Sequence, residues 1–507
     1  MLSHTIRIDC EFATANSFVA SQRIVNMLLK AAVFGLIYLL ALLLCAKIAS
    51  YRLRQCILLA ASLAFYAMWG GWFVLVLLAS VVGNFFLGAW IRRKPETPIL
   101  ALGVLLNLVL FLGTFKYLPE VAASYPSSLH FFLHLALPLG LSFWTFQAMS
   151  YLFDQYRGEE LDPSLLEFAL YLSFFPCVTS GPICRLPDML SQFRAAPQIS
   201  WANFRAGFCR IAIGALMVQI GRLLGQGLFG GDGINSGFDQ ISQWSTGDIC
   251  FLAVGFGLQL FFDFAGYSHI AIGAARCLGL TIPENFNRPF QSVTPSVFWT
   301  RWHMSLSFWI RDYAFLPMAM LWRSLWWRNA ALFLSMVIFG LWHKGTVLFA
   351  LWGAYHGILL VLHRLIQQLE KKLNFDMSAP IWTPISWLTT MVLISFGWIF
   401  FRANSLDQAV RMFSSLASFQ SGGSLSASFY WMVTILIFGY GAVSLLAEKI
   451  TSFAVEQDAS DKGSFFATIT RHRWYWIPAL YMTLWMIIVI IGAGPSSSTA
   501  EFMYRGF

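Results

Sequence analysis

Long apolar runs, each close to the length of a membrane-spanning helix, follow one another along most of this 507-residue chain. A helix needs about 20 apolar residues to cross the hydrocarbon core of a bilayer. The composition agrees with this pattern, since 58% of the residues are hydrophobic and only 11% are charged. Together these features exclude a soluble multidomain protein and predict an all-α polytopic membrane protein.

The apolar runs predict about 11–13 transmembrane helices. Some runs are too short or too broken to span simply, such as 165–178, which runs into Pro176, and the segment around Pro138. Non-helical backbone is tolerated at membrane depth only where protein or a water-filled cavity satisfies it, so we expect re-entrant or interfacial helices around a central cavity. The runs lie at 28–49, 55–91 (a pair or a re-entrant turn split at Gly70 and Gly71), 98–118, 131–153, 165–178, 205–229, 248–280, 328–366 (two segments), 383–401, 428–447 and 474–493.

The charged residues are scattered over short loops. The 33 Lys and Arg outnumber the 24 Asp and Glu, an excess that is typical of cytoplasmic loops and does not indicate nucleic-acid binding. No loop is long enough for an independent soluble domain, so we divide the chain into an N-terminal extension at 1–27 and one transmembrane domain at 28–507. We find no internal repeat, which disfavours an inverted-repeat transporter.

One polar segment, 298–313, stands out from the apolar pattern because it contains two arginines, a histidine, an aspartate and three tryptophans. As a single helix it would place Arg301 and Ser305 on one face, and His303 and Ser307 on another. Such a helix is too polar to face lipid, so it either lies in the membrane interface or lines a cavity. Both alternatives predict a water-accessible pocket beside it.

His343 lies between two apolar runs, at the end of the sequence Gly-Leu-Trp-His. An ionisable side chain in or beside a membrane is costly unless it is neutral or paired, which makes it a functional candidate. Burial favours the neutral imidazole, whose free nitrogen can act as a general base. A hydrogen-bonded structural histidine is the alternative at this position.

A metal site is the second alternative for the histidines. His303, His343 and His356 would have to converge with Asp263 or Asp312. No pair of metal ligands stands at helical spacing, and no G-x-S-x-G motif accompanies a serine nucleophile. We therefore predict no metal.

Asp263 lies within a long apolar run and needs a partner, such as Arg301, Arg311 or a helix N-terminus. A structural ion pair is the simplest role for it. The loop at 283–289, which has proline at both ends, leads into the polar segment, and we expect it to hold that segment in place.

Ten motifs, in order, resemble those of the membrane-bound O-acyltransferase family, in a bacterial branch that includes the membrane protein of alginate O-acetylation. The resemblance covers nearly all of the chain after the N-terminal extension. The motifs are ASLAFYAMWGGWF (61–73), LPLGLSFWTFQAMSYLFDQYRG (137–158), FFPCVTSGPICR (174–185), FDFAGYSHIAIG (262–273), IPENFNRPF (282–290), FWTRWHMSLSFWIRDY (298–313), GLWHKG (340–345), LWGAYHG (351–357), GWIFFRA (397–403) and the terminal EFMYRGF.

The resemblance implies a ring of transmembrane helices around a central funnel, with the catalytic region at 261–357. Carried onto matching positions, it makes His343 the general base and His303 the second polar residue of the active centre. This chain differs from the family pattern at Lys344, where close relatives commonly have glycine. Residues of the same motifs are candidates for contact with substrate: Arg301, Trp302, Ser305, Asp263, Asn285 and Trp342.

The resemblance also implies a function in the bacterial inner membrane. Relatives of this branch move an acyl group, usually acetyl, from a cytoplasmic thioester such as acetyl-CoA towards an extracytoplasmic polysaccharide. They bind no cofactor tightly, and a periplasmic esterase-like partner completes the transfer. D-alanyl transfer to teichoic acid and acylation of a protein or lipid are alternatives within the family. A non-catalytic donor transporter or scaffold is the alternative from another class.

Overall fold

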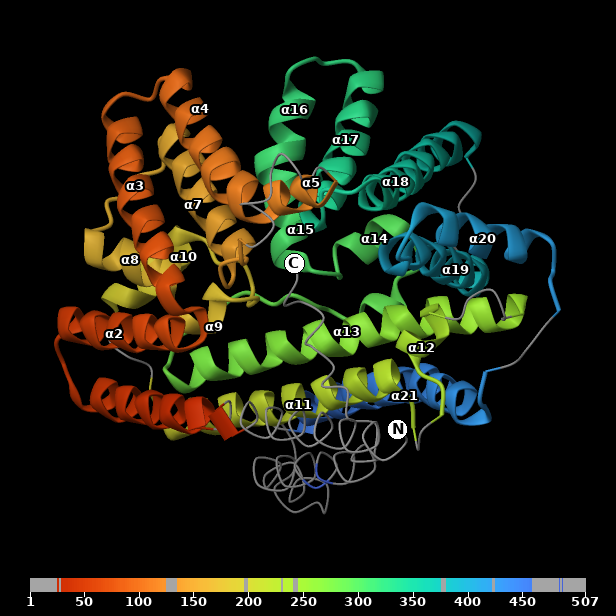
Figure 1. Ribbon diagram of the computed structural model, residues 1–507, viewed down its shortest axis with the longest axis horizontal. Helices are drawn as coiled ribbons and strands as arrows, with labels where there is room; N and C mark the ends of the chain where they lie inside the picture. The colour runs from red at the N-terminus through yellow and green to blue at the C-terminus, as the bar shows by residue number, and fades with distance from the viewer. Residues whose placement is uncertain are drawn as a thin grey trace, which may run out of the picture.

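A computed structural model describes residues 25–26, 29–124, 135–195, 199–228, 231–239, 245–374, 380–421, 425–457, 483 and 486. All regular structure in these residues is helical (Figure 1), which confirms the predicted fold class. Within them, eight helical stretches are long and apolar enough to cross a membrane. One of these stretches, Tyr51–Arg93, consists of two helices joined by a short 3-10 turn that begins at Gly71. Most of the N-terminal extension and of the predicted span at 474–493 falls outside the described residues.

Helix α13 occupies the middle of the molecule and joins its two sides. Figure 1 shows α2–α4 and α7–α10 on one side and α17–α20 towards the other, with α5 and α16 between them and α13 below the short helices α14 and α15. Helix α13 contacts α9 on the first side and α19 on the second. The helices are Leu29–Lys47, α2 Tyr51–Gly70, α3 Val74–Arg93, α4 Thr97–Leu105, η2 Leu106–Tyr117, α5 Leu118–Ser124, α7 Leu141–Tyr156, α8 Leu165–Ser173, α9 Phe175–Val178, α10 Leu186–Arg194, α11 Trp201–Gln226, α12 Ile234–Asp239, α13 Thr246–Cys277, α14 Pro295–Trp299, α15 Met304–Ile310, η6 Arg311–Phe315, α16 Leu316–Met320, α17 Leu325–His343, α18 Val347–Leu373, α19 Thr383–Arg402, α20 Leu406–Ala417 and α21 Ala427–Gln457.

Two of the broken apolar runs are broken in the structure as well. The run at 165–178 divides at Phe174 into α8 and α9. Helix α7 begins only at Leu141, after Gly140 in the left-handed conformation with φ 67°. A Cβ atom at Gly140 would lie 1.7 Å from the carbonyl oxygen of Val178, so only glycine allows α9 to pack against this turn.

The segment 298–313 does not form a single helix. The segment consists of the end of α14, a turn at 300–303, α15 and the first residues of the π-helix η6. His303 adopts a left-handed conformation with φ 43° and ψ 52°, which ends the helical path. Arg301 and Ser305 therefore do not share a helix face.

Backbone contacts from the proline-bounded loop explain this turn. The N–H of Met304 donates to the carbonyl oxygen of Asn285 at 2.8 Å, and the N–H of Asn287 donates to the carbonyl oxygen of Arg301 at 3.0 Å. These contacts give polar groups of the turn the partners that a continuous helix would have supplied. The loop thus holds the segment in a bent form through main-chain groups of Asn285 and Asn287, whereas the Glu284 carboxylate pairs with Arg210.

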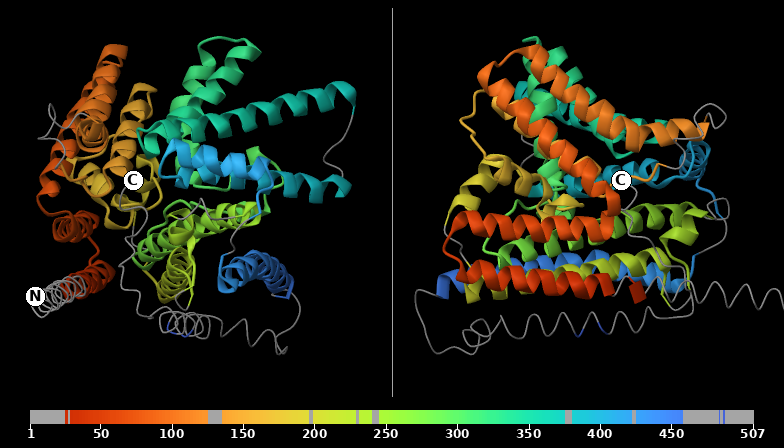
Figure 2. Two further views of the ribbon diagram at one scale, coloured as in Figure 1. Left: turned by 45° about the vertical axis from the view of Figure 1, so that its right-hand side comes forward. Right: turned by 60° about the vertical axis from the view of Figure 1, so that its left-hand side comes forward.

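Helices α11 and α13 lie side by side through regularly spaced small residues (Figure 2). A Cβ atom at Gly207 would lie 2.5 Å from the carbonyl oxygen of Gly273, and one at Gly214 would lie 2.4 Å from that of Gly266. Glycines let helix backbones approach closely, which is how helices associate in a membrane that offers little hydrophobic driving force between them. The pairing explains why α13 can remain central and almost wholly buried.

Replacing Gly214 with Ala should destabilise the protein by about 1–3 kcal/mol, because the added methyl group forces α11 and α13 apart. Thermal unfolding of the purified protein in detergent measures the effect. Gly83→Ala in α3 is the matched control, since a Cβ atom there meets nothing within 4 Å. Equal melting temperatures for the two variants would contradict this account of the interface.

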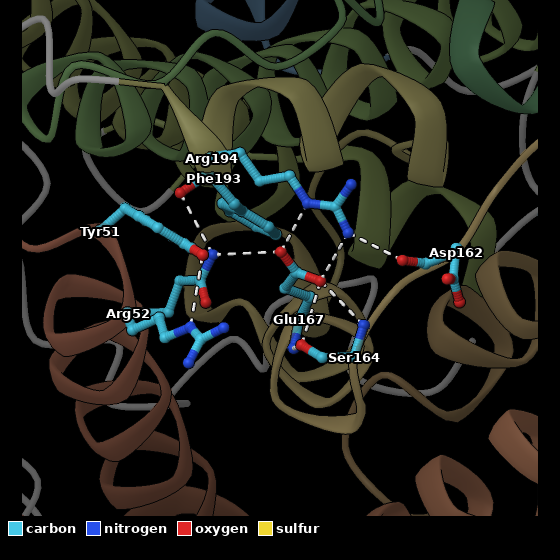
Figure 3. A network of polar contacts seen from close by, with 8 residues as sticks. Tyr51, Arg52, Asp162, Ser164, Glu167, Phe193 and Arg194 are labelled. Carbon is cyan, nitrogen blue, oxygen red and sulfur yellow. Dashed lines mark hydrogen bonds and ion pairs between the residues drawn. The ribbon is translucent and has the colours of Figure 1, made fainter.

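A polar network around Glu167 fastens α10 to α8 and α2 (Figure 3). The Arg194 guanidinium donates to both carboxylate oxygens of Glu167, at 2.7 and 2.9 Å, and Gln55 donates to Glu167 and to the Phe193 carbonyl oxygen. The backbone N–H of Ser164 adds a bond of 2.8 Å to the same carboxylate. These bonds, with Arg194 the largest cause, lower the pKa of Glu167 to about 2.

Glu167→Gln should lower the melting temperature at neutral pH because Arg194 loses its carboxylate partner. The folded pKa of Glu167 lies below the value of about 4.3 expected for the unfolded chain, so its contribution is complete above about pH 5 and is lost as the pH falls towards about 2. The difference in melting temperature between wild type and variant should therefore shrink as the pH falls from about 6 towards about 3 in thermal unfolding.

The exposed pair of Arg411 and Asp407 provides the control, since Asp407→Asn should change stability by less than about 0.5 kcal/mol. A difference in melting temperature that stays constant across this pH range would contradict a stabilising contribution from the ionised carboxylate of Glu167.

Candidate active site

His343 is the last residue of α17 and is only 2% exposed. Its ring lies against aromatic rings from three helices, with centroid distances of 5.3 Å to Phe339, 5.4 Å to Trp352 and 5.1 Å to Phe401. Intrahelical hydrogen bonding stops at this residue, and the chain leads on through Lys344 to α18. The structure thus places His343 inside the protein, where α17, α18 and α19 meet.

His303 lies in the turn between α14 and α15 and is 1% exposed. Its ring centroid is 4.6 Å from that of Phe264 and 6.4 Å from that of Phe143. Among the described residues, neither ring nitrogen has a hydrogen-bond partner. Burial lowers the pKa of His303 to about 3, so the imidazole is neutral and can donate one hydrogen bond and accept another.

Trp342 connects the two histidines. Its ring centroid is 4.6 Å from that of His343 and 6.4 Å from that of His303. It also stacks on Phe146 of α7 at 5.2 Å, and its indole nitrogen is buried without a partner among the described residues. Two histidines that are 40 positions apart in the sequence thus border one tryptophan, and the arrangement offers two imidazoles and one N–H donor.

His356, on α18, extends the same cluster. It is fully buried, with centroids 5.0 Å from Trp352 and 5.1 Å from Trp299, and both ring nitrogens lack partners among the described residues. A Cβ atom at Gly397 would lie 2.5 Å from its Nε2 atom. Sequence reasoning considered His356 only as a metal ligand, and within the part of the chain described, no group of three or more potential metal ligands forms.

Ser305 and Asn285, two of the predicted substrate-binding residues, are engaged by the protein itself. The Ser305 hydroxyl donates to Oδ1 of Asn285 at 2.5 Å and accepts from the N–H of Ile183 at 3.0 Å. The Asn285 amide donates to the hydroxyl of Ser268 at 2.9 Å. These bonds tie α15 to the loops before α10 and α14, so both residues shape the site.

Trp302 and Arg301 also have structural contacts. Trp302 is 3% exposed, stacks on Phe298 with centroids 5.4 Å apart, and lies 5.0 Å from Trp398. Arg301 is partly exposed, and its carbonyl oxygen accepts the bond from the 283–289 loop. Trp302 therefore belongs to the aromatic cluster that surrounds the site.

Asp263 lies at the interface of α13 with α11. It is 7% exposed, and a Cβ atom at Gly221 of α11 would lie 2.2 Å from its Oδ1 atom. Its expected partner Arg311 pairs instead with Asp312, at 2.7 Å, and Asp312 also pairs with Arg185. Asp263 is thus adjacent to α11, and the charges of the polar segment anchor η6 to its neighbours.

Lys116 is a residue of the site that sequence reasoning missed. Its Nζ atom donates to the Ser142 hydroxyl at 3.1 Å and to the carbonyl oxygen of Trp342, and it lies 4.9 Å from the centroid of the Trp342 ring. The side chain is buried, with 6% exposed. A signal was available, because Lys116 is the single charged residue in the apolar run at 98–118.

Comparison with known proteins agrees with this architecture. The sequence pattern of the MBOAT, membrane-bound O-acyltransferase family, matches residues 86–401. The chain is 33% identical over 384 residues to the probable alginate O-acetylase of Pseudomonas aeruginosa, covering 73% of this chain and 70% of that protein. It is 30% identical over 396 residues to the peptidoglycan O-acetyltransferase of Helicobacter pylori, covering 71% and 73%.

A third relative acts with a different acyl group. The teichoic acid D-alanyltransferase of Bacillus subtilis is 30% identical over 329 residues, covering 61% of this chain and 79% of that protein. All three relatives are named as enzymes that transfer an acyl group. The family pattern includes both His303 and His343, and the chain belongs to the membrane-bound O-acyltransferase family as a multi-pass membrane O-acyltransferase.

Proposed function

We propose that this protein takes an acetyl group, or a similar small acyl group, from a cytoplasmic thioester and moves it across the membrane. The group is used there for O-acetylation of an exported polysaccharide. The donor is acetyl-CoA or another acyl thioester, and no cofactor is held tightly. The observation that carries the proposal is the burial of His303 and His343 on the same tryptophan, Trp342, in one aromatic cluster. The two acetyl-transferring relatives support acetyl as the group.

In this mechanism His343 acts as the general base. Its neutral nitrogen takes the proton from a hydroxyl group while the oxygen attacks the carbonyl carbon of the thioester. The carbonyl oxygen becomes an oxyanion, which then re-forms the carbonyl as the carbon–sulfur bond breaks. The sulfur leaves with the electron pair of that bond and takes up the proton from His343. The products are an ester and a free thiol.

His303 assists by donating a hydrogen bond to the oxyanion. A neutral imidazole has one N–H, and His303 has no competing partner for it among the described residues. The indole N–H of Trp342, equally without a partner in the described part of the chain, is a second donor. Donors that are already buried and oriented stabilise developing charge more than the same groups do in water.

The final acceptor lies outside the cytoplasmic membrane in this proposal. The chain resides in a bacterial inner membrane, and a periplasmic esterase-like partner completes transfer to the polymer. The alginate-acetylating and peptidoglycan-acetylating relatives support an extracytoplasmic glycan as acceptor.

His343→Gln should reduce acetylation by about 100-fold or more, because glutamine keeps hydrogen-bonding capacity but cannot take the proton. Acetate on surface polysaccharide is measured by mass analysis in a strain that has only the variant chain. The amount of membrane-inserted protein is measured in parallel. Normal acetylation in this strain would favour the donor transporter or scaffold instead.

His303→Ala should reduce the rate by about 10²–10³-fold, the usual cost of one oxyanion donor, while the variant still inserts and remains folded. His303→Asn, which retains a buried N–H donor, should recover part of the lost rate. The readout is the acetate content per folded protein, with thermal unfolding as the measure of folding. A loss of activity that follows the loss of folded protein would make His303 a structural residue.

D-alanyl transfer to teichoic acid is a second candidate, favoured by the match that spans 79% of the D-alanyltransferase of Bacillus subtilis. The two candidates differ in the group left on the polymer. Mass analysis of surface glycans from strains with and without the chain distinguishes an acetyl ester from a D-alanyl ester. Loss of D-alanine with unchanged acetate would replace the main proposal.

A further inference from the structure

The C-terminal end of α17 carries His343 and leaves its last carbonyl groups without partners inside the helix. Unsatisfied backbone groups are costly at membrane depth, so partners must come from elsewhere. Two of these carbonyl oxygens accept side-chain donors from η2, a segment more than 220 positions earlier in the sequence. Lys116 donates to the carbonyl of Trp342, and the Tyr117 hydroxyl donates to that of Leu341 at 3.2 Å.

A third contact lies just beyond the helix. The carboxylate of Glu120 accepts the backbone N–H of Gly345 at 3.2 Å. Lys116 and Glu120 stand four positions apart, so they project from one face of a continuous helical stretch. Figure 1 shows this stretch, from α4 to α5, reaching from the N-terminal helices to α15 and α17. Lys116, Tyr117 and Glu120, which we name the α17 cap, thus hold positions 341, 342 and 345 on both sides of His343.

Lys116 has further contacts that fix its ammonium group. It donates to Ser142 in the first turn of α7, and it lies over the face of Trp342, the ring that borders both histidines. A cation on the face of an indole is attracted by the ring electrons, and the attraction grows where water is excluded. Lys116 also lies in η2, a π-helix of 12 residues, and π-helical turns are rare and frequent at functional sites.

We propose that the α17 cap positions the acyl-transfer site. In this proposal Lys116 holds the Trp342 ring and the end of α17 in place, and so orients the base His343 towards the reacting groups. This inference rests on the role proposed for His343. A buried lysine in an apolar run is expensive, and its three contacts on α7 and α17 account for its presence. A small displacement of a reacting group is enough to cost about 10²-fold in rate.

The test compares Lys116→Met, Lys116→Arg and wild type in membrane vesicles that contain the chain and the cell's own polysaccharide. The rate of radiolabelled acetate incorporation is measured as a function of acetyl-CoA concentration. We expect Lys116→Met to lower kcat per folded protein by about 10–100-fold with KM for acetyl-CoA within about two-fold of wild type. Lys116→Arg, which keeps a buried donor, should recover part of kcat.

Lys94→Met is the matched control, because Lys94 is an exposed lysine at the C-cap of α3 and should give wild-type kinetics. A Lys116→Met variant that stays folded and keeps a kcat within about two-fold of wild type would overturn the inference. An equal change in KM, or a loss of kcat that follows the fraction of unfolded protein, would also overturn it.

Hydrogen exchange gives a reading that does not depend on the acyl acceptor. In Lys116→Met and Glu120→Gln, amides in the peptide containing Gly345 should exchange about ten-fold faster than in wild type, while the α11 peptides are unchanged. Unchanged exchange at this peptide would refute the cap. If wild type incorporates no acetate, the proposed function fails, and hydrogen exchange alone then decides whether the cap exists.

Discussion

The need to satisfy backbone polar groups inside a membrane shapes this protein wherever a helix stops. The turn at His303 is supported by the main chain of Asn285, and the end of α17 is supported by Lys116 and Tyr117. The first support comes from the nearby loop at 283–289, and the second from a segment more than 220 positions earlier in the sequence. Other parts of the chain complete hydrogen bonds where the helices next to the two histidines begin or end.

The helix ends at His303 and His343 bring the two side chains to one site. A side chain in the middle of a helix faces one side of that helix, whereas His303 and His343 lie where a helix begins or ends, and both rings border Trp342. Left-handed backbone at a non-glycine residue costs about 1–3 kcal/mol and persists only when the surroundings impose it. At His303 the surroundings do so through the 283–289 loop and through Ser305, which is bonded to Asn285.

Aromatic packing buries this region inside the protein. Trp302, Trp352 and Trp398 are each no more than 3% exposed, and their rings connect the floor of the site to α13, α18 and α19. Several indole and imidazole nitrogens in the cluster lack partners among the described residues. Buried donors without partners are costly, and their concentration around the two histidines fits a site where a polar group of a substrate provides the missing bonds.

The helical fold and most of its spans were predictable, because apolar runs of spanning length leave a helix as the form that satisfies its own backbone. The family could also be predicted, because its motifs are short stretches of sequence that can be recognised without the fold. His343 was predictable from its position between apolar runs, and Lys116 from its isolation within one, although only His343 was recognised. Asp263 and Ser305 were named as candidates for substrate contact from the family motifs, whereas the structure places Asp263 against α11 and bonds Ser305 to Asn285.

The sequence by itself determined a polytopic helical membrane protein of the acyltransferase family and the identity of its candidate base. The tertiary structure decided the rest of the site: the bend at 300–303, the shared border of His303 and His343 on Trp342, and the cap that Lys116 places on α17. The physical reason is that helix formation follows from hydrogen bonds between residues four positions apart. The end of α17, by contrast, is bonded by residues more than 220 positions earlier, and the bend at His303 by a loop outside its own helix, so neither follows from the local helical pattern.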